Sequence, residues 1–145
     1  MNVYTIGFTQ KSAEAFFTAL QRAGVRRLVD VRLNNVSQLA GFAKKADLAY
    51  FLRAIGGIGY VHEARLAPRP EDLVAYREGR LAWPDYETSY RALLHERKVE
   101  NTVPRTLFDV PSVLLCSEAR PEQCHRRLAA EYLAEAWGNL DIVHL

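Results

Sequence analysis

The residues best suited to chemistry stand together in the segment LLCSEARPEQCHR, residues 114–126. It holds both cysteines of the chain, Cys116 and Cys124, and the second is followed directly by His125 and Arg126. Thiols, an imidazole and a guanidinium are groups used in nucleophilic catalysis, metal binding and anion binding. Which of these the segment supports depends on the elements that position its side chains.

Three interpretations of this segment stay open. N–H groups at the start of a helix, with arginines close by, favour an anion or a thiolate. Two thiols and an imidazole could also supply three metal ligands, but their spacing matches no Cys-x-x-Cys zinc pattern, and we expect no metal. The third interpretation is structural, because a buried cysteine packs as a small apolar residue.

A helix predicted over 121–138 orients these side chains. On an ideal helical wheel His125 falls within the apolar side, Arg126 towards its flank and Cys124 near the polar side. We therefore expect His125 and Arg126 to point back to the strand ends and Cys124 to point sideways or outward. Cys116, at the end of the preceding strand, should lie beside the same helix start.

Composition sets the class of protein. The chain has 145 residues, of which 49% are hydrophobic and 25% charged, as in one ordinary globular domain spanning 1–145. The net charge of +2 does not decide for or against nucleic acid. No apolar run is long enough for a bilayer, and the first residues lack a signal-peptide pattern. We expect a cytoplasmic protein, not bound to membrane, whose cysteines are thiols.

Apolar runs alternate with helical patterns along the chain, and this alternation predicts the fold. We expect an α/β fold, with βαβ units that form a sheet of about five mainly parallel strands, covered by helices on both faces. Strands are predicted over 2–7, 25–32, 58–63, 112–117 and 140–145, and helices over 11–24, 44–57, 68–79, 84–100 and 121–138. Ligands of such sheets bind outside the carboxyl ends of the strands.

Polar residues follow several of these strands. Asp30 and Arg32 share a face of the second strand, and Arg32 could hold a phosphate or carboxylate through two parallel hydrogen bonds. The alternative is a buried polar network, in which Asp30 caps a loop or pairs with Arg126. Asn34 and Asn35 add amide donors.

Two further groups have weaker signals. Thr9, after the first strand, could donate to an anion, although a simple helix start is favoured for this loop. Trp83, Tyr86 and Tyr90 could stack on bases, but their helical spacing favours a place in the core.

The order of YTIGF, LVDVR, YVH, LLCSEARPEQCHR and a closing VHL resembles the DUF488 family of small α/β proteins. The resemblance covers the chain from end to end and is weakest over 64–111. It implies a three-layer, Rossmann-like open sheet and no established activity. The family's signature positions fall on Gly7, Asp30, Arg32, Cys116, Glu118, Cys124, His125 and Arg126.

The chain departs from this family pattern at two places. Phe8 stands where the family usually has a histidine, and Gln38 stands where its loop often has an arginine. Any chemistry that depends on those two side chains is missing here. Shared binding is therefore more plausible than a shared reaction.

We expect a domain that binds an anionic group at the strand ends, from a nucleotide, a nucleic-acid end or a phosphorylated metabolite. The sequence leaves open whether it is an enzyme and whether it oligomerises, and the absence of cofactor motifs predicts no cofactor. The alternatives are a thiol enzyme or redox sensor and a non-catalytic adaptor. The candidate ligand-binding residues are Thr9, Arg32, Asn34, Asn35 and Arg126, and the candidate catalytic residues are Asp30, Cys116, Glu118, Cys124 and His125.

Overall fold

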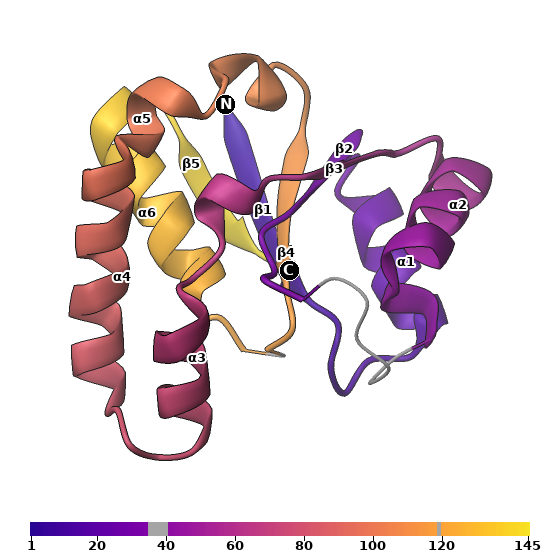
Figure 1. Ribbon diagram of the computed structural model, residues 1–145. Helices are drawn as coiled ribbons and strands as arrows, with labels where there is room; N and C mark the ends of the chain where they lie inside the picture. The colour runs from indigo at the N-terminus through magenta and orange to yellow at the C-terminus, as the bar shows by residue number, and fades with distance from the viewer. Residues whose placement is uncertain (35–40, 119) are drawn as a thin grey trace.

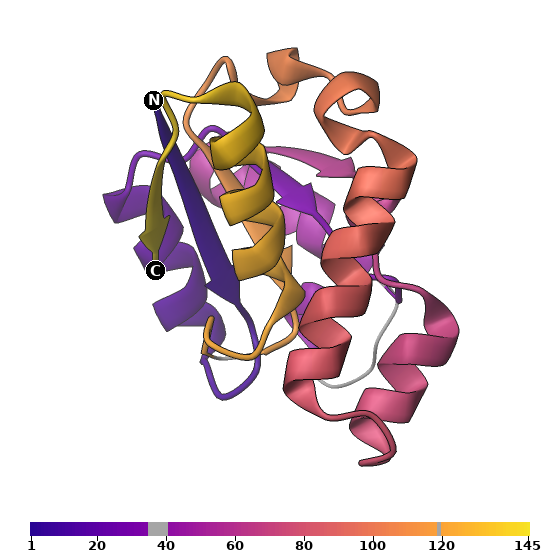
Figure 2. The same cartoon turned by 90° about the vertical axis from the view of Figure 1, so that its left-hand side faces the viewer.

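A five-stranded parallel sheet forms the centre of the protein (Figures 1 and 2). The computed structural model describes residues 1–34, 41–118 and 120–145. The strand order is β3-β2-β4-β1-β5, which confirms the predicted α/β open sheet. The strands are β1 (Asn2–Gly7), β2 (Arg27–Asp30), β3 (Gly59–His62), β4 (Ser112–Cys116) and β5 (Asp141–His144).

Helices cover both faces of this sheet (Figure 1). On one face lie α1 (Ala13–Arg22) and α2 (Lys45–Gly56), and on the other lie α3 (Pro70–Arg77), α4 (Trp83–Arg97), α5 (Val99–Thr102) and α6 (His125–Trp137). Short 3₁₀ turns span Gly41–Ala43, Ala64–Leu66 and Arg105–Phe108. The described part of the chain has no helix with the length and apolarity needed to cross a membrane.

Burial along the strands follows from this layering. All five residues of β4 are buried, because the strand is central and covered on both faces. The edge strands β3 and β5 contain no buried residue. The uninterrupted apolar run VLLC, residues 113–116, is typical of such a central strand. It ends at Cys116, where the chain leaves the sheet towards α6.

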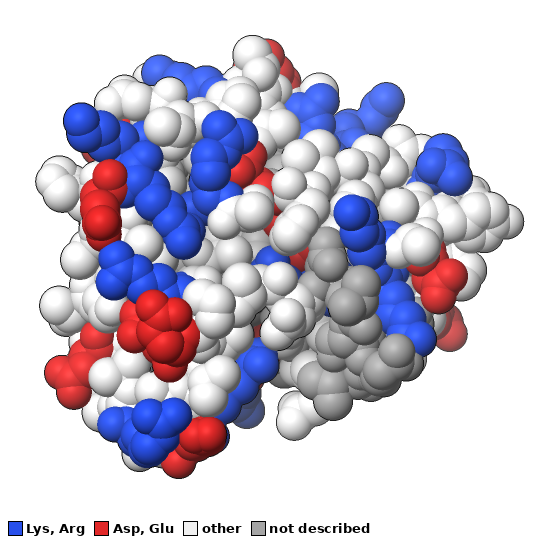
Figure 3. Space-filling model, viewed as in Figure 1, with Lys and Arg blue, Asp and Glu red and all other residues white. Residues whose placement is uncertain are grey.

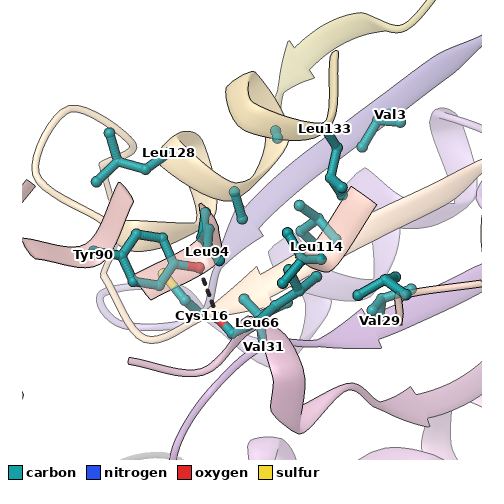
Figure 4. Packing of buried hydrophobic residues seen from close by; sticks show 14 of the residues in the cluster. Val3, Val29, Val31, Leu66, Tyr90, Leu94, Leu114, Cys116, Leu128 and Leu133 are labelled. Atoms are coloured by element: carbon teal, nitrogen blue, oxygen red, sulfur yellow. Dashed lines mark hydrogen bonds between the residues drawn. The ribbon is translucent and has the colours of Figure 1, made fainter. Parts of the chain in front are cut away.

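The helical layer of α3–α6 packs on the sheet through its own apolar core (Figure 4). Leu94, Leu114 and Leu128 all belong to this core, and so does Cys116 at the carboxyl end of β4. The hydroxyl of Tyr90 donates to the carbonyl of Leu66 at 2.7 Å, so its polar end is satisfied inside the core. Tyr86 and Tyr90 are each 2% exposed, which confirms their predicted place in the core.

The start of α6 differs from the prediction. The helix begins at His125 instead of Pro121, and Cys124 takes the N-cap position with an extended backbone. Before it, the amide of Cys124 donates to the carbonyl of Pro121 at 3.2 Å, which closes a turn. This turn brings Cys124 against the end of β4.

A candidate ligand pocket at the carboxyl ends of β2 and β4

The chain leaves two neighbouring strands in opposite directions. After β2 it runs to α2 on one face, whereas after β4 it runs to α6 on the other face (Figure 1). Connections that diverge in this way open a crevice at the carboxyl ends of a parallel sheet, where such folds bind ligands.

A pocket of about 260 Å³ lies in this crevice. Its floor comes from the ends of β2 and β4 and from the start of α6, and its wall comes from α3 and the start of α4. The lining residues are Arg32, Leu33, Asn34, Leu73, Tyr76, Arg77, Trp83, Tyr86, Cys116, Ser117, Glu118, Gln123, Cys124 and His125.

Asp30 holds Arg32 in a fixed orientation at this floor. The two carboxylate oxygens accept from Nε of Arg32 at 2.9 Å and from its Nη2 at 2.8 Å. Tyr60 donates its hydroxyl to the same carboxylate at 2.6 Å, and the Arg32 guanidinium lies 5.2 Å from the ring centre of Phe8. Both charged side chains are buried, so Asp30 orients and compensates the arginine that lines the pocket.

His125 lines the pocket with a neutral ring. Its Nε2 lies 2.8 Å from the carbonyl oxygen of Val31, which can only accept, so Nε2 carries the hydrogen. Burial lowers the pKa of His125 to about 4, helped by the charges of Arg126 and Arg77 and opposed by the Val31 hydrogen bond. Among the described residues Nδ1 has no hydrogen-bond partner, and its lone pair can accept a proton or bind a metal.

Arg126 is buried beneath the pocket and is not among its lining residues. Its Nη1 donates to the backbone carbonyl of Glu118 and lies 3.4 Å from Sγ of Cys116, and its Nε lies 3.3 Å from Oγ1 of Thr5. Burial lowers the pKa of Arg126 to about 10, so it stays charged at neutral pH. These contacts give Arg126 a role in joining β1, β4 and α6.

The cysteines correct two expectations. Cys116 and Cys124 form a disulfide, whereas thiols were expected. Cys124 is 2% exposed and points to the end of β4, not outward, because the N-cap position turns it away from the orientation of an ideal helix. Both residues line the pocket, and Cys116, Cys124 and His125 lie together there.

The sequence marks Trp83 and Tyr86 of the pocket wall as candidates for base stacking, but it does not mark Arg77 or Tyr76. Arg77 at the end of α3 is exposed, and the described residues give it no hydrogen bond or ion pair. Tyr76, Trp83 and Tyr86 stand beside it, with the rings of Trp83 and Tyr86 stacked 5.4 Å apart. A helical pattern alone does not reveal that α3 lies over the strand ends.

A second, more polar hollow of about 690 Å³ adjoins this pocket and shares Tyr76, Glu118 and Gln123 with it. Thr9 lies here beside Arg120, but its hydroxyl donates to the carbonyl of Ser117 at 2.7 Å. Thr9 thus ties the loop after β1 to the loop after β4.

The other candidates fall into three groups. Asn34 is exposed and lines the pocket, whereas Asn35 and Gln38 lie outside the described residues. Glu118 is exposed and borders both hollows. Asp30 reaches the site only through Arg32, because its own side chain is fully buried and does not line the pocket.

Surface charge around the pocket is mixed. On the face of Figure 3, Lys and Arg side chains are interspersed with Asp and Glu over the layer of α3–α6. Between α4 and α6, Arg91 and Arg127 form ion pairs with Glu131 at 2.7 and 2.9 Å. The described residues on this face therefore form no continuous positive band of the kind that follows a nucleic-acid backbone.

Comparison with known proteins identifies one family. The model of the family described as "Domain of unknown function DUF488" matches residues 12–133. No curated protein and no solved structure is detectably similar to the chain.

Proposed function

The chain belongs to the DUF488 family, whose domain has no known function, and from the pocket we propose that it binds a small anionic ligand of the nucleotide kind. The observation that carries this proposal is Arg77, a guanidinium without a partner among the described residues, at a pocket walled by aromatic rings. A guanidinium can hold a phosphate through two hydrogen bonds, and a base has a flat face that stacks on aromatic rings.

The floor of the pocket supports the same ligand chemistry. Arg32 adds a second guanidinium whose position is set by Asp30, and Asn34 adds an amide. The pocket and the adjoining hollow together measure hundreds of Å³, in the range of about 300–1,000 Å³ that small ligands occupy. Mixed surface charge favours such a ligand over a long nucleic acid.

The two alternatives are less well supported. A thiol enzyme needs a thiolate, and Cys116 and Cys124 must first be released from their disulfide. A non-catalytic adaptor would have a closed polar cluster, whereas Arg32 and His125 line an open pocket. A cytoplasmic location belongs to our proposal too, and a reducing compartment would hold both cysteines as thiols.

Titration with adenosine 5′-monophosphate, followed by calorimetry and by quenching of Trp83 fluorescence, tests the binding. We expect Arg77→Ala to weaken binding about tenfold or more, since a charge-assisted hydrogen bond contributes roughly 1.5–3 kcal/mol. Arg80→Ala is the matched control, because Arg80 is nearby and exposed but pairs with Glu78 and does not line the pocket.

The ligand series separates the parts of the proposal. Guanosine 5′-monophosphate, ribose 5-phosphate and inorganic phosphate test the base, the sugar phosphate and the anion alone. Absence of binding by the whole series at millimolar concentration, or equal weakening by Arg77→Ala and Arg80→Ala, would overturn the proposal.

A further inference from the structure

Three potential metal ligands meet at the floor of the pocket. The two sulfur atoms of Cys116 and Cys124 and a ring nitrogen of His125 all lie within 4.8 Å of one another, and all three residues are buried. A tetrahedral zinc ion with bonds of about 2.3 Å to sulfur and 2.0–2.1 Å to nitrogen keeps its ligand atoms roughly 3.3–3.8 Å apart. Small movements of these side chains would suffice once the sulfur atoms are no longer bonded.

The backbone places the cysteines on separate elements. Their Cα atoms are 7.5 Å apart, wider than the roughly 4.4–6.8 Å that is usual for a disulfide. Two thiolates bound to one tetrahedral ion keep their sulfur atoms farther apart than a disulfide bond does, so they suit a wider separation of the Cα atoms. No zinc spacing is visible in the sequence because the ligands come from the end of β4 and from the N-cap of α6.

The surroundings of His125 resemble those of a metal-binding imidazole. Metal-bound histidines commonly donate their other ring nitrogen to a carbonyl or carboxylate, which fixes the ring and its tautomer. Here Nε2 of His125 donates to the Val31 carbonyl at 2.8 Å, and Nδ1 keeps its lone pair. His125 therefore offers a metal ion the free ring nitrogen of an oriented, neutral imidazole.

Positive charge beside the sulfur atoms favours thiolates. Nη1 of Arg126 lies 3.4 Å from Sγ of Cys116, and Arg32 and Arg77 line the same pocket. Two thiolates would neutralise the charge of a bound divalent ion. When no ion is bound, the nearby arginines would compensate the charge of the thiolates. Zinc and other ions that prefer sulfur and imidazole ligands suit this set, whereas calcium and magnesium prefer oxygen.

We propose that the reduced pair Cys116 and Cys124, together with His125, binds one Zn²⁺ ion at the floor of the pocket. Three protein ligands leave the fourth position open, as in catalytic zinc sites, and the pocket is where water or an anionic ligand can take it. The disulfide is the oxidised, metal-free form of the same site.

Zn²⁺ binding requires that the Cys116–Cys124 disulfide is reduced first. A phosphine and water reduce the disulfide to two thiols and leave a phosphine oxide. Zn²⁺ then replaces the two thiol protons, and Nδ1 of His125 donates its lone pair without losing a proton. Reoxidation by a disulfide reagent, whose own S–S bond breaks to give two thiols, forms the Cys116–Cys124 bond again and expels the ion.

The test uses the full chain, reduced with tris(2-carboxyethyl)phosphine without air and treated with a chelator. Zn²⁺ is titrated against a chromophoric chelator, and Co²⁺ serves as the spectroscopic probe. We expect one ion per chain, with a thiolate-to-cobalt charge-transfer band and the visible bands of a tetrahedral site. The oxidised protein should bind no ion.

Matched variants identify the ligands. Cys116→Ser and Cys124→Ser should each weaken Zn²⁺ binding by at least about a hundredfold, and His125→Gln by about 10–100-fold. Gln keeps a donor for the Val31 carbonyl, and His95→Gln, at an exposed position of α4, should bind as the wild type does.

Absence of Zn²⁺ binding by the folded, reduced wild type would overturn the proposal. Zn²⁺ binding that persists in the oxidised protein would overturn it too. The comparison of oxidised and reduced wild type stands even where a cysteine variant fails to fold. Because the ion is titrated without nucleotide, failure of this proposal is distinct from failure of the anion pocket.

Discussion

The backbone carbonyl of Glu118 fills the space beside Gly7 where a side chain would begin. A Cβ atom on Gly7 would lie 1.6 Å from that oxygen and 2.6 Å from Nη1 of Arg126. The lack of a side chain lets the loop after β4 cross the end of β1, and it lets Arg126 reach the same carbonyl. The glycine that ends the first strand thus positions one side of the pocket floor.

Gly7→Ala should destabilise the protein by about 2–4 kcal/mol, because the added methyl group meets backbone that cannot move aside without disturbing Arg126. Urea denaturation measures the free energy of unfolding. Gly59→Ala is the control, since its Cβ would meet nothing closer than the Arg26 carbonyl at 3.8 Å. Equal effects of the two substitutions would contradict this account.

Arg126→Met should lower the free energy of unfolding by about 1–3 kcal/mol, because it leaves the Glu118 carbonyl without this buried donor. The exposed Arg26, replaced by Met, should cost far less. Both values come from urea denaturation. A stability unchanged in Arg126→Met would mean that its contacts do not join β1, β4 and α6.

Asp30→Asn should destabilise the protein by about 3–5 kcal/mol, since it removes the charge that compensates the buried Arg32 guanidinium. The double variant Asp30→Asn with Arg32→Met should recover part of this loss, because it removes the uncompensated charge as well. Chemical denaturation of the wild type, the single variants Asp30→Asn and Arg32→Met, and the double variant gives the coupling energy. Additive losses would show that the pair does not act as a unit.

His144 should titrate below its ordinary pKa of 6.5, first because of burial and then because of the Arg126 charge. Its Nδ1 lies 2.5 Å from Oγ1 of Thr5, a hydroxyl that also accepts from Nε of Arg126 and so directs its own hydrogen to the ring. Protonation of His144 would break this arrangement.

Protonation of His144 should lower the stability of the folded protein. The unfolded chain takes up the proton first, so the free energy of unfolding should decrease as pH falls from about 6.5 towards the lower folded pKa. Resolved histidine signals in an NMR titration give the pKa, and Arg126→Met should raise it. A midpoint at or above the ordinary value in the wild type would refute this prediction.

The sequence indicated the layers of the fold because strand and helix signals are local. Five apolar runs and the helices between them were enough for the parallel sheet. The start of α6 was placed too early, because Pro121 suits the first turn of a helix and here closes a separate turn.

The site was only partly predictable for a physical reason. Asp30 and Arg32 are close in the chain, so strand parity was enough to place them on one face, whereas the structure pairs Asp30 with Arg32 and not with Arg126. Whether Arg126 faces the pocket or lies beneath it depends on the depth at which α6 packs. The contribution of Arg77 and Tyr76 depends on α3, which is far from β2 and β4 in sequence.

Helix α3 contributes Leu73, Tyr76 and Arg77 to the pocket, yet it contains no buried residue. Its substitutions should therefore cost the sheet little, whereas those at Gly7, Asp30 or Arg126 disturb the core. The floor and the wall of the pocket are thus under different constraints. Substitutions in α3 would reshape the wall of the pocket and leave the residues of its floor in place.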